Sequence, residues 1–356
     1  MVLSALSPWN LLQLLCGLVL LIAGAELLVR CAGRMAANLK VRPLLIGLTV
    51  VALGSSAPQL TVSLQAALND STDIAVGSVI GSNIFNVLVT LGLSALIIPL
   101  RVSRQLVRLD IPLMIVASAL VFALALNKQL DRLDGAILLG GLLVYLAVLL
   151  RQSRHSGHHH SNHDLPRTSW LHNILLMLSA LVLLGLAGHL LLGAAVTVAT
   201  ELGLSERIIG LTIIAVSTSL PELATSLIAA FRGQRELAVG NVIGSNVFNL
   251  LGVLGLTALV APAPLSVSPN ALAFDLPVML GVAALCLPVF YTGYRVTRAE
   301  GLLFLGLYLA YGLHVVSFTT GMPLAGKLEH LMVFFVLPAL LVFLLFSTLR
   351  AWRRQH

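Results

Sequence analysis

Long apolar runs broken by short polar loops are the main pattern along this chain. Several runs reach the roughly 18 to 20 residues that a helix needs to cross a bilayer. The first run has no basic segment before it and no small-residue cleavage pattern after it, which favours a retained helix over a cleaved signal. The runs predict eleven membrane helices, near residues 9–29, 43–69, 73–99, 109–127, 132–151, 170–200, 206–231, 236–261, 271–292, 299–319 and 328–350.

One apolar stretch, residues 210–260, is unusual because it carries a carboxylate, several amides and several hydroxyls. Residues 47–97 repeat it without gaps at a constant offset, with identity at about half of the positions. Polar groups at membrane depth are costly unless they bind something, so the doubled stretch is the candidate functional site. Pro58 and Pro221 interrupt the two copies, and the carbonyl groups they free are tolerated only where they line a cavity or coordinate a ligand.

Composition supports the membrane assignment. The chain is 58% hydrophobic and only 10% charged, with a mean hydropathy of +1.00, whereas soluble domains carry about 25% charged residues. The formal charge of +7 is better explained by membrane topology than by a nucleic-acid partner. The three cysteines, Cys16, Cys31 and Cys286, are scattered in or beside apolar runs and are expected to pack as small apolar residues.

Basic residues orient the predicted bundle. Seventeen of the 21 Lys and Arg residues fall in alternate loops and in the C-terminal tail, while the other loops hold Lys128, Arg132, Arg207 and Lys327. The positive-inside rule makes the basic loops cytoplasmic. We therefore expect the N-terminus outside and the C-terminus in the cytoplasm.

Each copy of the repeat lies in a set of five predicted helices. Because five is odd, the second set must cross the membrane upside down relative to the first. Inverted repeats are typical of secondary transporters, which bind substrate near the midplane where interrupted helices of the two halves meet. We expect an all-α polytopic membrane protein with two inverted five-helix repeats and one extra C-terminal helix. The expected segments are 1–151 (first repeat), 152–169 (His-rich cytoplasmic linker), 170–319 (second repeat) and 320–356 (extra helix and basic tail).

The chemistry of the doubled stretch limits what it can bind. Carboxylate, amide, hydroxyl and carbonyl oxygens suit Na⁺, Ca²⁺ or H⁺, and the repeats lack a thiolate or paired histidines for softer metals. We therefore expect inorganic cations and the lipid bilayer as partners, with no cofactor, no nucleic acid and no obligate protein partner. A membrane enzyme would need a nucleophile or metal constellation that the sequence does not offer. A channel would not need inverted repeats with proline-broken helices.

Both copies resemble the α-repeats of the sodium/calcium exchangers, in the cation/Ca²⁺ antiporter superfamily, and the chain is similar to their bacterial, membrane-only members. Gly24-Ala25-Glu26 is similar to the Gly-Ala-acid sequence of the family's first helix. The matching motifs are Ser217-Thr218-Ser219-Leu220-Pro221-Glu222 with Gly240-Asn241-Val242-Ile243-Gly244-Ser245-Asn246-Val247-Phe248-Asn249, and Gly54-Ser55-Ser56-Ala57-Pro58-Gln59 with Gly77-Ser78-Val79-Ile80-Gly81-Ser82-Asn83-Ile84-Phe85-Asn86.

The resemblance implies an antiporter in the inner membrane that exchanges Na⁺ for Ca²⁺ by alternating access. Helices 2, 3, 7 and 8 would hold a midplane site, and helices 1 and 6 would slide past it. The family's metal ligands fall on Glu222, Gln59, Asn86 and Asn249. The other cation-binding positions would be Ala52, Ser55, Ser56, Ser82, Ala215, Thr218, Ser219 and Ser245.

The chain departs from that pattern at two charged positions. Gln59 stands where the pattern has a second glutamate, and Asn249 stands where it often has an aspartate, so only Glu222 is charged. A lost ion pair at about 4 Å forfeits roughly 4 kcal/mol at an effective dielectric constant near 20. Two interpretations stay open, which are Na⁺/Ca²⁺ exchange with altered affinity or stoichiometry and exchange of a monovalent cation (Na⁺ or Li⁺) for H⁺.

The remaining polar positions have simpler interpretations. Asn83 and Asn246 suit hydrogen bonds between helices, and Gln59 suits either a ligand or a positioning donor. Glu26, which the repeat offset pairs with His189, is expected to have a structural or vestibule role. Asp110 and Asp275 are expected to be charges at helix N-termini. The linker suits a solvated connector, although five histidines in it could bind a peripheral metal: His155, His158, His159, His160 and His163.

Overall fold

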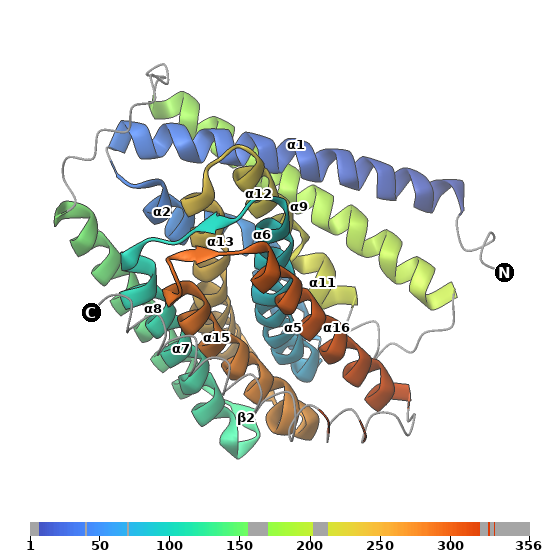
Figure 1. Ribbon diagram of the computed structural model, residues 1–356. Helices are drawn as coiled ribbons and strands as arrows, with labels where there is room; N and C mark the ends of the chain where they lie inside the picture. Colours follow the sequence, from blue (N-terminus) through green and yellow to red (C-terminus); the bar gives the residue numbers. More distant parts are fainter. Residues whose placement is uncertain are drawn as a thin grey trace.

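A computed structural model describes residues 7–39, 41–69, 71–155, 170–201 and 213–320 of the chain, together with the isolated positions 327 and 331. Nearly all of the described chain is helical (Figure 1). Seven described helices are long and apolar enough to cross a membrane, or eight if a bent pair counts as one span. The protein is therefore an all-helical membrane protein, as expected.

The elements of the first half follow the predicted runs closely. They are α1 (Pro8–Leu39), α2 (Pro43–Ile46), η1 (Gly47–Val51), α3 (Ala52–Ser55), α4 (Ala57–Leu68), α5 (Thr72–Phe85), η2 (Asn86–Leu91), α6 (Gly92–Ile97), β1 (Leu100–Arg101), η3 (Leu106–Asp110), α7 (Ile111–Leu124), η4 (Ala125–Asn127), β2 (Gln129–Leu130) and α8 (Arg132–His155).

The described elements of the second half follow a similar order, without a counterpart of η4. They are α9 (Trp170–Glu201), α11 (Ala215–Thr218), α12 (Leu220–Phe231), α13 (Arg235–Val247), η6 (Phe248–Val253), α14 (Leu254–Val260), β3 (Leu265–Ser266), η7 (Ala271–Asp275), α15 (Leu276–Tyr291), β4 (Arg295–Val296) and α16 (Arg298–Thr320). The predicted helix at 328–350 and the start of the one at 206–231 lie outside the described residues.

The first predicted helix was too short. The expected end near residue 29 rested on the charged residues that follow it, but α1 continues to Leu39. Arg30 and Arg34 therefore lie on the helix rather than in a loop after it. Charged side chains end an apolar run without ending a helix, because arginine is itself a good helix former.

Both proline-interrupted helices are broken where the sequence predicts. Ser56 forms a turn between α3 and α4, and the two parts of that span meet at an angle of 40°. Ser219 forms the equivalent turn between α11 and α12. Each proline occupies the first turn of the helix that follows, where its missing N–H is tolerated. Broken helices of this kind place backbone ends and short side chains inside the membrane.

Pairing between the short strands reveals the direction of the two halves. The strands β1 and β3 hold equivalent places in the two halves, and so do β2 and β4. However, β1 pairs with β4, and β2 pairs with β3, both in antiparallel register. Because β1 and β2 lie at opposite ends of the span that contains α7, equivalent strands lie at opposite ends of the molecule. The two halves therefore run in opposite directions.

The spans that contain α5 and α13 form the centre of the bundle. Within their most apolar windows, 89% and 83% of the residues are buried, against 28% to 56% for the other described spans. The long helices α1 and α9 pack against each other and cross obliquely over one side of the bundle (Figure 1). The central spans of both halves are thus enclosed by protein, whereas α1 and α9 lie at the edge.

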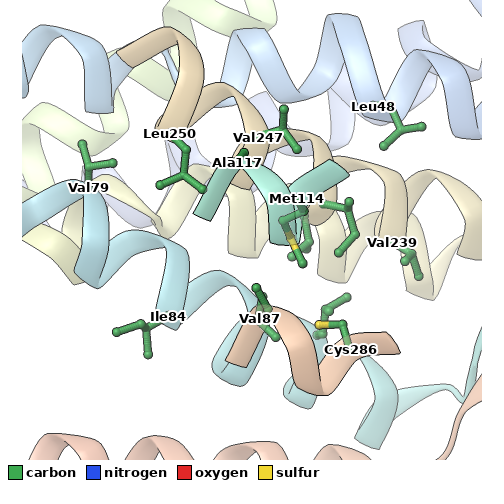
Figure 2. Close-up of a cluster of buried hydrophobic side chains, with 14 of the residues drawn as sticks. Leu48, Val79, Ile84, Val87, Met114, Ala117, Val239, Val247, Leu250 and Cys286 are labelled. Carbon is green, nitrogen blue, oxygen red and sulfur yellow. The ribbon is translucent and has the colours of Figure 1, made fainter. Parts of the chain in front are cut away.

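Apolar side chains and close-packed glycines fill the contacts between these spans. Val79 and Ile84 of α5, Met114 and Ala117 of α7, Val239 and Val247 of α13, and Cys286 of α15 belong to one buried cluster (Figure 2). Gly244 lets α13 approach the first half, since a Cβ atom there would lie 2.7 Å from the Leu48 carbonyl oxygen. Such small residues are typical of helix contacts in membranes, where lipid offers no hydrophobic drive for association.

Candidate cation site

Four asparagines join the two central helices in a reciprocal arrangement. Asn86 Nδ2 donates to Asn246 Oδ1 at 3.1 Å, and Asn249 Nδ2 donates to Asn83 Oδ1 at 3.2 Å. Asn246 Nδ2 in turn donates to the Asn83 carbonyl oxygen at 3.2 Å. Asn83 and Asn246 therefore hold the amide nitrogens of Asn249 and Asn86. They act as links between helices, which was one of their expected roles.

This arrangement leaves two amide oxygens free. The Oδ1 atoms of Asn86 and Asn249 are buried and have no hydrogen-bond partner within the described chain. Both residues lie in π-helical turns, Asn86 at the start of η2 and Asn249 in η6. Single π-helical turns are frequent at functional sites. The sequence did not predict these turns, because a wider turn has no distinctive residue pattern.

Glu222 lies at the break between α11 and α12. Its side chain is 1% exposed, and Oε1 accepts a hydrogen bond from Ser56 of the opposite half at 3.3 Å. The second carboxylate oxygen, Oε2, is buried without a partner in the described part of the chain, as is the Ser219 hydroxyl oxygen. Burying an unpaired carboxylate is costly, so this oxygen requires a proton or a cation.

Hydroxyl groups join the broken helix of each half to the central helix of the other half. Ser82 Oγ of α5 lies 3.3 Å from the Thr218 hydroxyl and 3.2 Å from the Ala215 carbonyl oxygen. The reciprocal contact joins Ser245 of α13 to Ser55 at 3.3 Å. Ser55 also lies 3.3 Å from the Ala52 carbonyl oxygen. All twelve cation-binding positions predicted from sequence are buried, and these contacts join several of them across the two halves.

Gln59 is held differently from Glu222. Its amide nitrogen donates to Ser78 at 3.0 Å and to Ser63 at 3.2 Å, and its amide oxygen accepts from Ser82 at 2.8 Å. Gln59 is 1% exposed. Its three contacts agree with a positioning donor, although Oε1 remains close to the site through Ser82.

Among the proposed cation-binding residues, four oxygens have no hydrogen-bond partner in the part of the chain that the structure describes. They come from one carboxylate, two amides and one hydroxyl, all buried. Neutral oxygens with a single carboxylate are ligands suited to hard cations such as Na⁺ or Ca²⁺. These four oxygens belong to Asn86, Ser219, Glu222 and Asn249.

Several residues that support the site were not assigned a role from sequence. Ser63 and Ser78 hold Gln59, while Asn241 Nδ2 donates to Ser226 at 2.9 Å and to the Glu222 carbonyl oxygen at 3.3 Å. Ser63 lies four residues after Gln59, one helical turn from its partner, and Ser226 lies at the equivalent place four residues after Glu222. That four-residue spacing could have predicted the contact between Gln59 and Ser63 from the sequence.

Glu26 does not meet His189, its partner by the repeat offset. The Glu26 carboxylate pairs instead with Arg30, one turn away on α1, and with Arg232 after α12, where Arg232 Nε lies 2.8 Å from Oε2. The side chain of Arg232 is 43% exposed, so the cluster lies at the edge of the bundle. Equivalence in the repeat did not predict the contact of Glu26, because the opposite charge beside it comes from Arg232 and not from His189.

The two aspartates were wrongly placed at helix N-termini. Asp110 and Asp275 each end a π-helical turn inside a continuous span, a turn after the helix begins. Asp275 accepts hydrogen bonds from Tyr311 at 3.1 Å and Asn270 at 3.4 Å. The proline two residues later suggested a helix start, but a π-helical turn accommodates it within the helix.

The predicted peripheral metal site falls outside the described residues. Of the five histidines in the linker, His155 ends α8 without a described side chain, and His158, His159, His160 and His163 are not described. Within the described chain, no group of three or more His, Cys, Asp or Glu side chains is arranged to hold a metal ion.

Comparison with known proteins agrees with this geometry. The family model described as "Sodium/calcium exchanger protein" matches residues 9–151 and 172–317. A putative antiporter, CaxA, of Alkalimonas amylolytica is 39% identical over 307 residues, covering 83% of this chain and 95% of the relative. The inner membrane protein YrbG of Escherichia coli is 36% identical over 278 residues, covering 76% of this chain and 85% of the relative.

A solved structure of the sodium-calcium exchanger NCX_Mj, soaked with 10 mM Na⁺ and zero Ca²⁺, has the same fold. It superposes with a TM-score of 0.73 at 30% sequence identity, covering 87% of this chain and 98% of that chain. The family match covers both halves and includes Asn86, Ser219, Glu222 and Asn249. This chain belongs to the sodium/calcium exchanger family of membrane antiporters.

Proposed function

We propose that this protein is a secondary active antiporter that exchanges Na⁺ for Ca²⁺ by alternating access. The observation that carries the proposal is that both halves supply buried oxygens, four in all, without hydrogen-bond partners among the described residues. A cation bound there would be held by Asn86, Ser219, Glu222 and Asn249, with Gln59 and the surrounding hydroxyls and carbonyls completing its shell. The full proposed set adds Ala52, Ser55, Ser56, Ser82, Ala215, Thr218 and Ser245.

In the proposed cycle, α1 and α9 move across the broken helices and central helices that carry the site. This movement opens the site to one side of the membrane at a time. Support comes from the arrangement of the bundle, since α1 and α9 pack on each other at its edge while α5 and α13 are enclosed. Buried oxygens without partners are costly, so the movement of α1 and α9 is favoured only when a cation fills the site. This requirement couples the transport of the two ions.

We further propose the repeat boundaries 1–151 and 170–319, with 152–169 as a cytoplasmic linker and 320–356 as an additional C-terminal helix and basic tail. The N-terminus would lie outside the inner membrane and the C-terminus in the cytoplasm. Contacts at the ends of the bundle support this orientation. Arg101 and Arg295 belong to the basic loops and lie opposite each other in the β1–β4 pair, at one end of the bundle. Arg132 belongs to the loops with few basic residues and contacts the Ala261 carbonyl oxygen near the β2–β3 pair, at the other end.

A second candidate is exchange of Na⁺ or Li⁺ for H⁺. The observation that favours it is the charge of the site, because Glu222 is the one carboxylate among the proposed ligands. A single carboxylate neutralises a monovalent cation but leaves Ca²⁺ with a net positive charge in a poorly screened interior.

Reconstituted vesicles separate the two candidates. For Na⁺/Ca²⁺ exchange, an outward Na⁺ gradient drives ⁴⁵Ca²⁺ uptake that Glu222→Gln abolishes. For the second candidate, vesicles show no Ca²⁺ flux, while a Na⁺ or Li⁺ gradient moves protons and the same substitution stops that movement. Thr61→Val serves as a control for expression, since the Thr61 hydroxyl bonds to the Ala57 carbonyl oxygen on an exposed face.

A further inference from the structure

Gln59 and Glu222 are equivalent site residues, and in each half an amide donates a hydrogen bond to a serine near them. The amide lies on a different helix in the two halves. In the first half the amide belongs to Gln59 of α4, which donates to Ser78 of α5 and to Ser63 of its own helix. In the second half the amide belongs to Asn241 of α13, which donates to Ser226 of α12. At the repeat offset Gln59 is equivalent to Glu222, and Ser78 is equivalent to Asn241.

We propose that Ser78 and Asn241 are positioning residues that determine which half contributes a carboxylate to the site. Where the central helix carries asparagine, its amide supplies the donor for the neighbouring serine, and a carboxylate can occupy the site position. Where the central helix carries serine, the donor must come from the site residue itself, which is therefore an amide and has no charge.

Hydrogen-bonding capacity explains this rule. Asn241 uses both parts of its amide, since Nδ2 donates to Ser226 and to the Glu222 carbonyl oxygen while Oδ1 accepts from Ser55. Glu222 is thereby left to accept from Ser56 and to keep Oε2 free. A carboxylate cannot donate, so a glutamate at position 59 beside Ser78 would forfeit both donations that Gln59 makes.

Burial makes the forfeited bonds important. Gln59, Ser63 and Ser78 are each at most 1% exposed, as are Glu222, Ser226 and Asn241. Water does not reach these groups readily, so each lost hydrogen bond leaves a buried polar atom to find another partner. The side chains at positions 59 and 78 are therefore expected to depend on each other.

The test is a double-mutant cycle with Gln59→Glu, Ser78→Asn and the combined variant. In cation-free detergent solution, we expect each single substitution to lower the melting temperature by about 2 to 5 °C, as loss of one or two buried hydrogen bonds predicts. The combined variant reproduces the arrangement of the second half, so its melting temperature should return to within about 2 °C of the unmodified protein.

Added Ca²⁺ provides a readout that a purely structural role would not change. The combined variant carries a second carboxylate, so Ca²⁺ should raise its melting temperature by more than it raises that of the unmodified protein. A further control is Thr61→Val with Ser78→Asn, which should show no recovery because Thr61 does not contact Ser78 within the described chain.

The proposal is overturned if the two single effects simply add in the combined variant, or if Gln59→Glu alone is as stable and as responsive to Ca²⁺ as the combined variant. The larger Ca²⁺ response of the combined variant rests on the proposed function, but recovery of stability does not. Recovery without any Ca²⁺ response would support the positioning role and count against Na⁺/Ca²⁺ exchange.

Discussion

Ser56 of the first half donates a hydrogen bond to Glu222 of the second half, with 3.3 Å between Oγ and Oε1. The bond crosses the junction between two broken helices, and it engages one carboxylate oxygen while the other stays free. The Ser56 donor orients the carboxylate, while Oε2 has no partner in the described part of the chain. The carboxylate is therefore oriented in advance for a ligand.

Removing that donor should weaken cation binding without abolishing it. In Ser56→Ala, Glu222 loses one hydrogen bond, which is worth about 1.5 kcal/mol for a bond to a charged group. We expect the apparent affinity for the transported cation to fall by roughly tenfold. Equilibrium binding measured by isothermal titration checks this value. An unchanged affinity, with Thr61→Val as the reference, would show that the bond does not orient Glu222.

Adding a second carboxylate should shift preference toward a divalent cation. In Asn249→Asp the new charge would stand where a free amide oxygen now points, adding up to about 4 kcal/mol of attraction for each cation charge at about 4 Å. Asn83 can present its amide nitrogen to the new carboxylate, because that nitrogen now has contacts of only 3.5 Å to the Asn246 carbonyl oxygen and 3.8 Å to Met279 Sδ.

Competition between ²²Na⁺ and Ca²⁺ for uptake measures that preference. We expect the ratio of Ca²⁺ to Na⁺ affinity to rise at least about tenfold in Asn249→Asp. Asn86→Asp is the matched variant, because its amide has the same reciprocal contact with Asn246. A fall in the ratio for both variants would contradict the placement of these two oxygens at the cation.

Close approach of α13 to the first half should make Gly244 intolerant of a side chain. In Gly244→Ala the new Cβ would lie 2.7 Å from the Leu48 carbonyl oxygen and 2.8 Å from Ala52 Cβ, so the helices must separate. We expect a loss of about 1 to 3 kcal/mol in stability. Gly281→Ala in α15 has nothing within 4 Å of the new atom and should be neutral or slightly stabilising.

Thermal unfolding followed by size-exclusion chromatography compares these two glycine variants. The expected order is a lower melting temperature for Gly244→Ala and an unchanged or higher one for Gly281→Ala. Equal melting temperatures would mean that α13 does not pack as closely as the distances at Gly244 require.

The aspartate and tyrosine pairs of the two halves should respond unequally to loss of a hydroxyl. Tyr311 donates to Asp275 at 3.1 Å, whereas the Tyr145 hydroxyl and the Asp110 carboxylate of the first half are buried without hydrogen-bond partners in the described chain. Tyr311→Phe should cost about 1 to 3 kcal/mol, because a buried carboxylate loses a donor. Tyr145→Phe should cost less than about 0.5 kcal/mol. The difference between the two unfolding temperatures is the measurement, and a larger loss for Tyr145→Phe would refute the assignment.

Much of the fold could be predicted because it depends on patterns that repeat along the chain. Apolar runs located the helices, Pro58 and Pro221 located the breaks, and the odd number of helices per repeat gave the inversion, which the strand pairs confirm. The end of α1 and the place of Asp110 were wrong, because charged residues and prolines mark boundaries only on average.

The candidate site residues could be named from sequence, but the sequence did not indicate which of them hold other side chains and which leave an oxygen available for a ligand. Asn83 and Asn86 are three residues apart and so share a helix face, but that spacing does not indicate that one holds an amide while the other leaves an oxygen unpartnered among the described residues. That distinction depends on contacts with the opposite half, which only the fold supplies. For the same reason the partners of Gln59 on α5 and of Glu26 near α12 were not predicted.

The exchanged strand pairs at the two ends have a consequence for assembly. The strands of each half pair only with strands of the other half in the described chain, since β1 pairs with β4 and β2 with β3. Because β1 is equivalent to β3 and β2 to β4, the two halves meet through matching surfaces. A chain divided between residues 155 and 170 should therefore be recoverable as two fragments that associate with each other in one-to-one ratio, whereas either fragment alone would expose unpaired backbone at both ends.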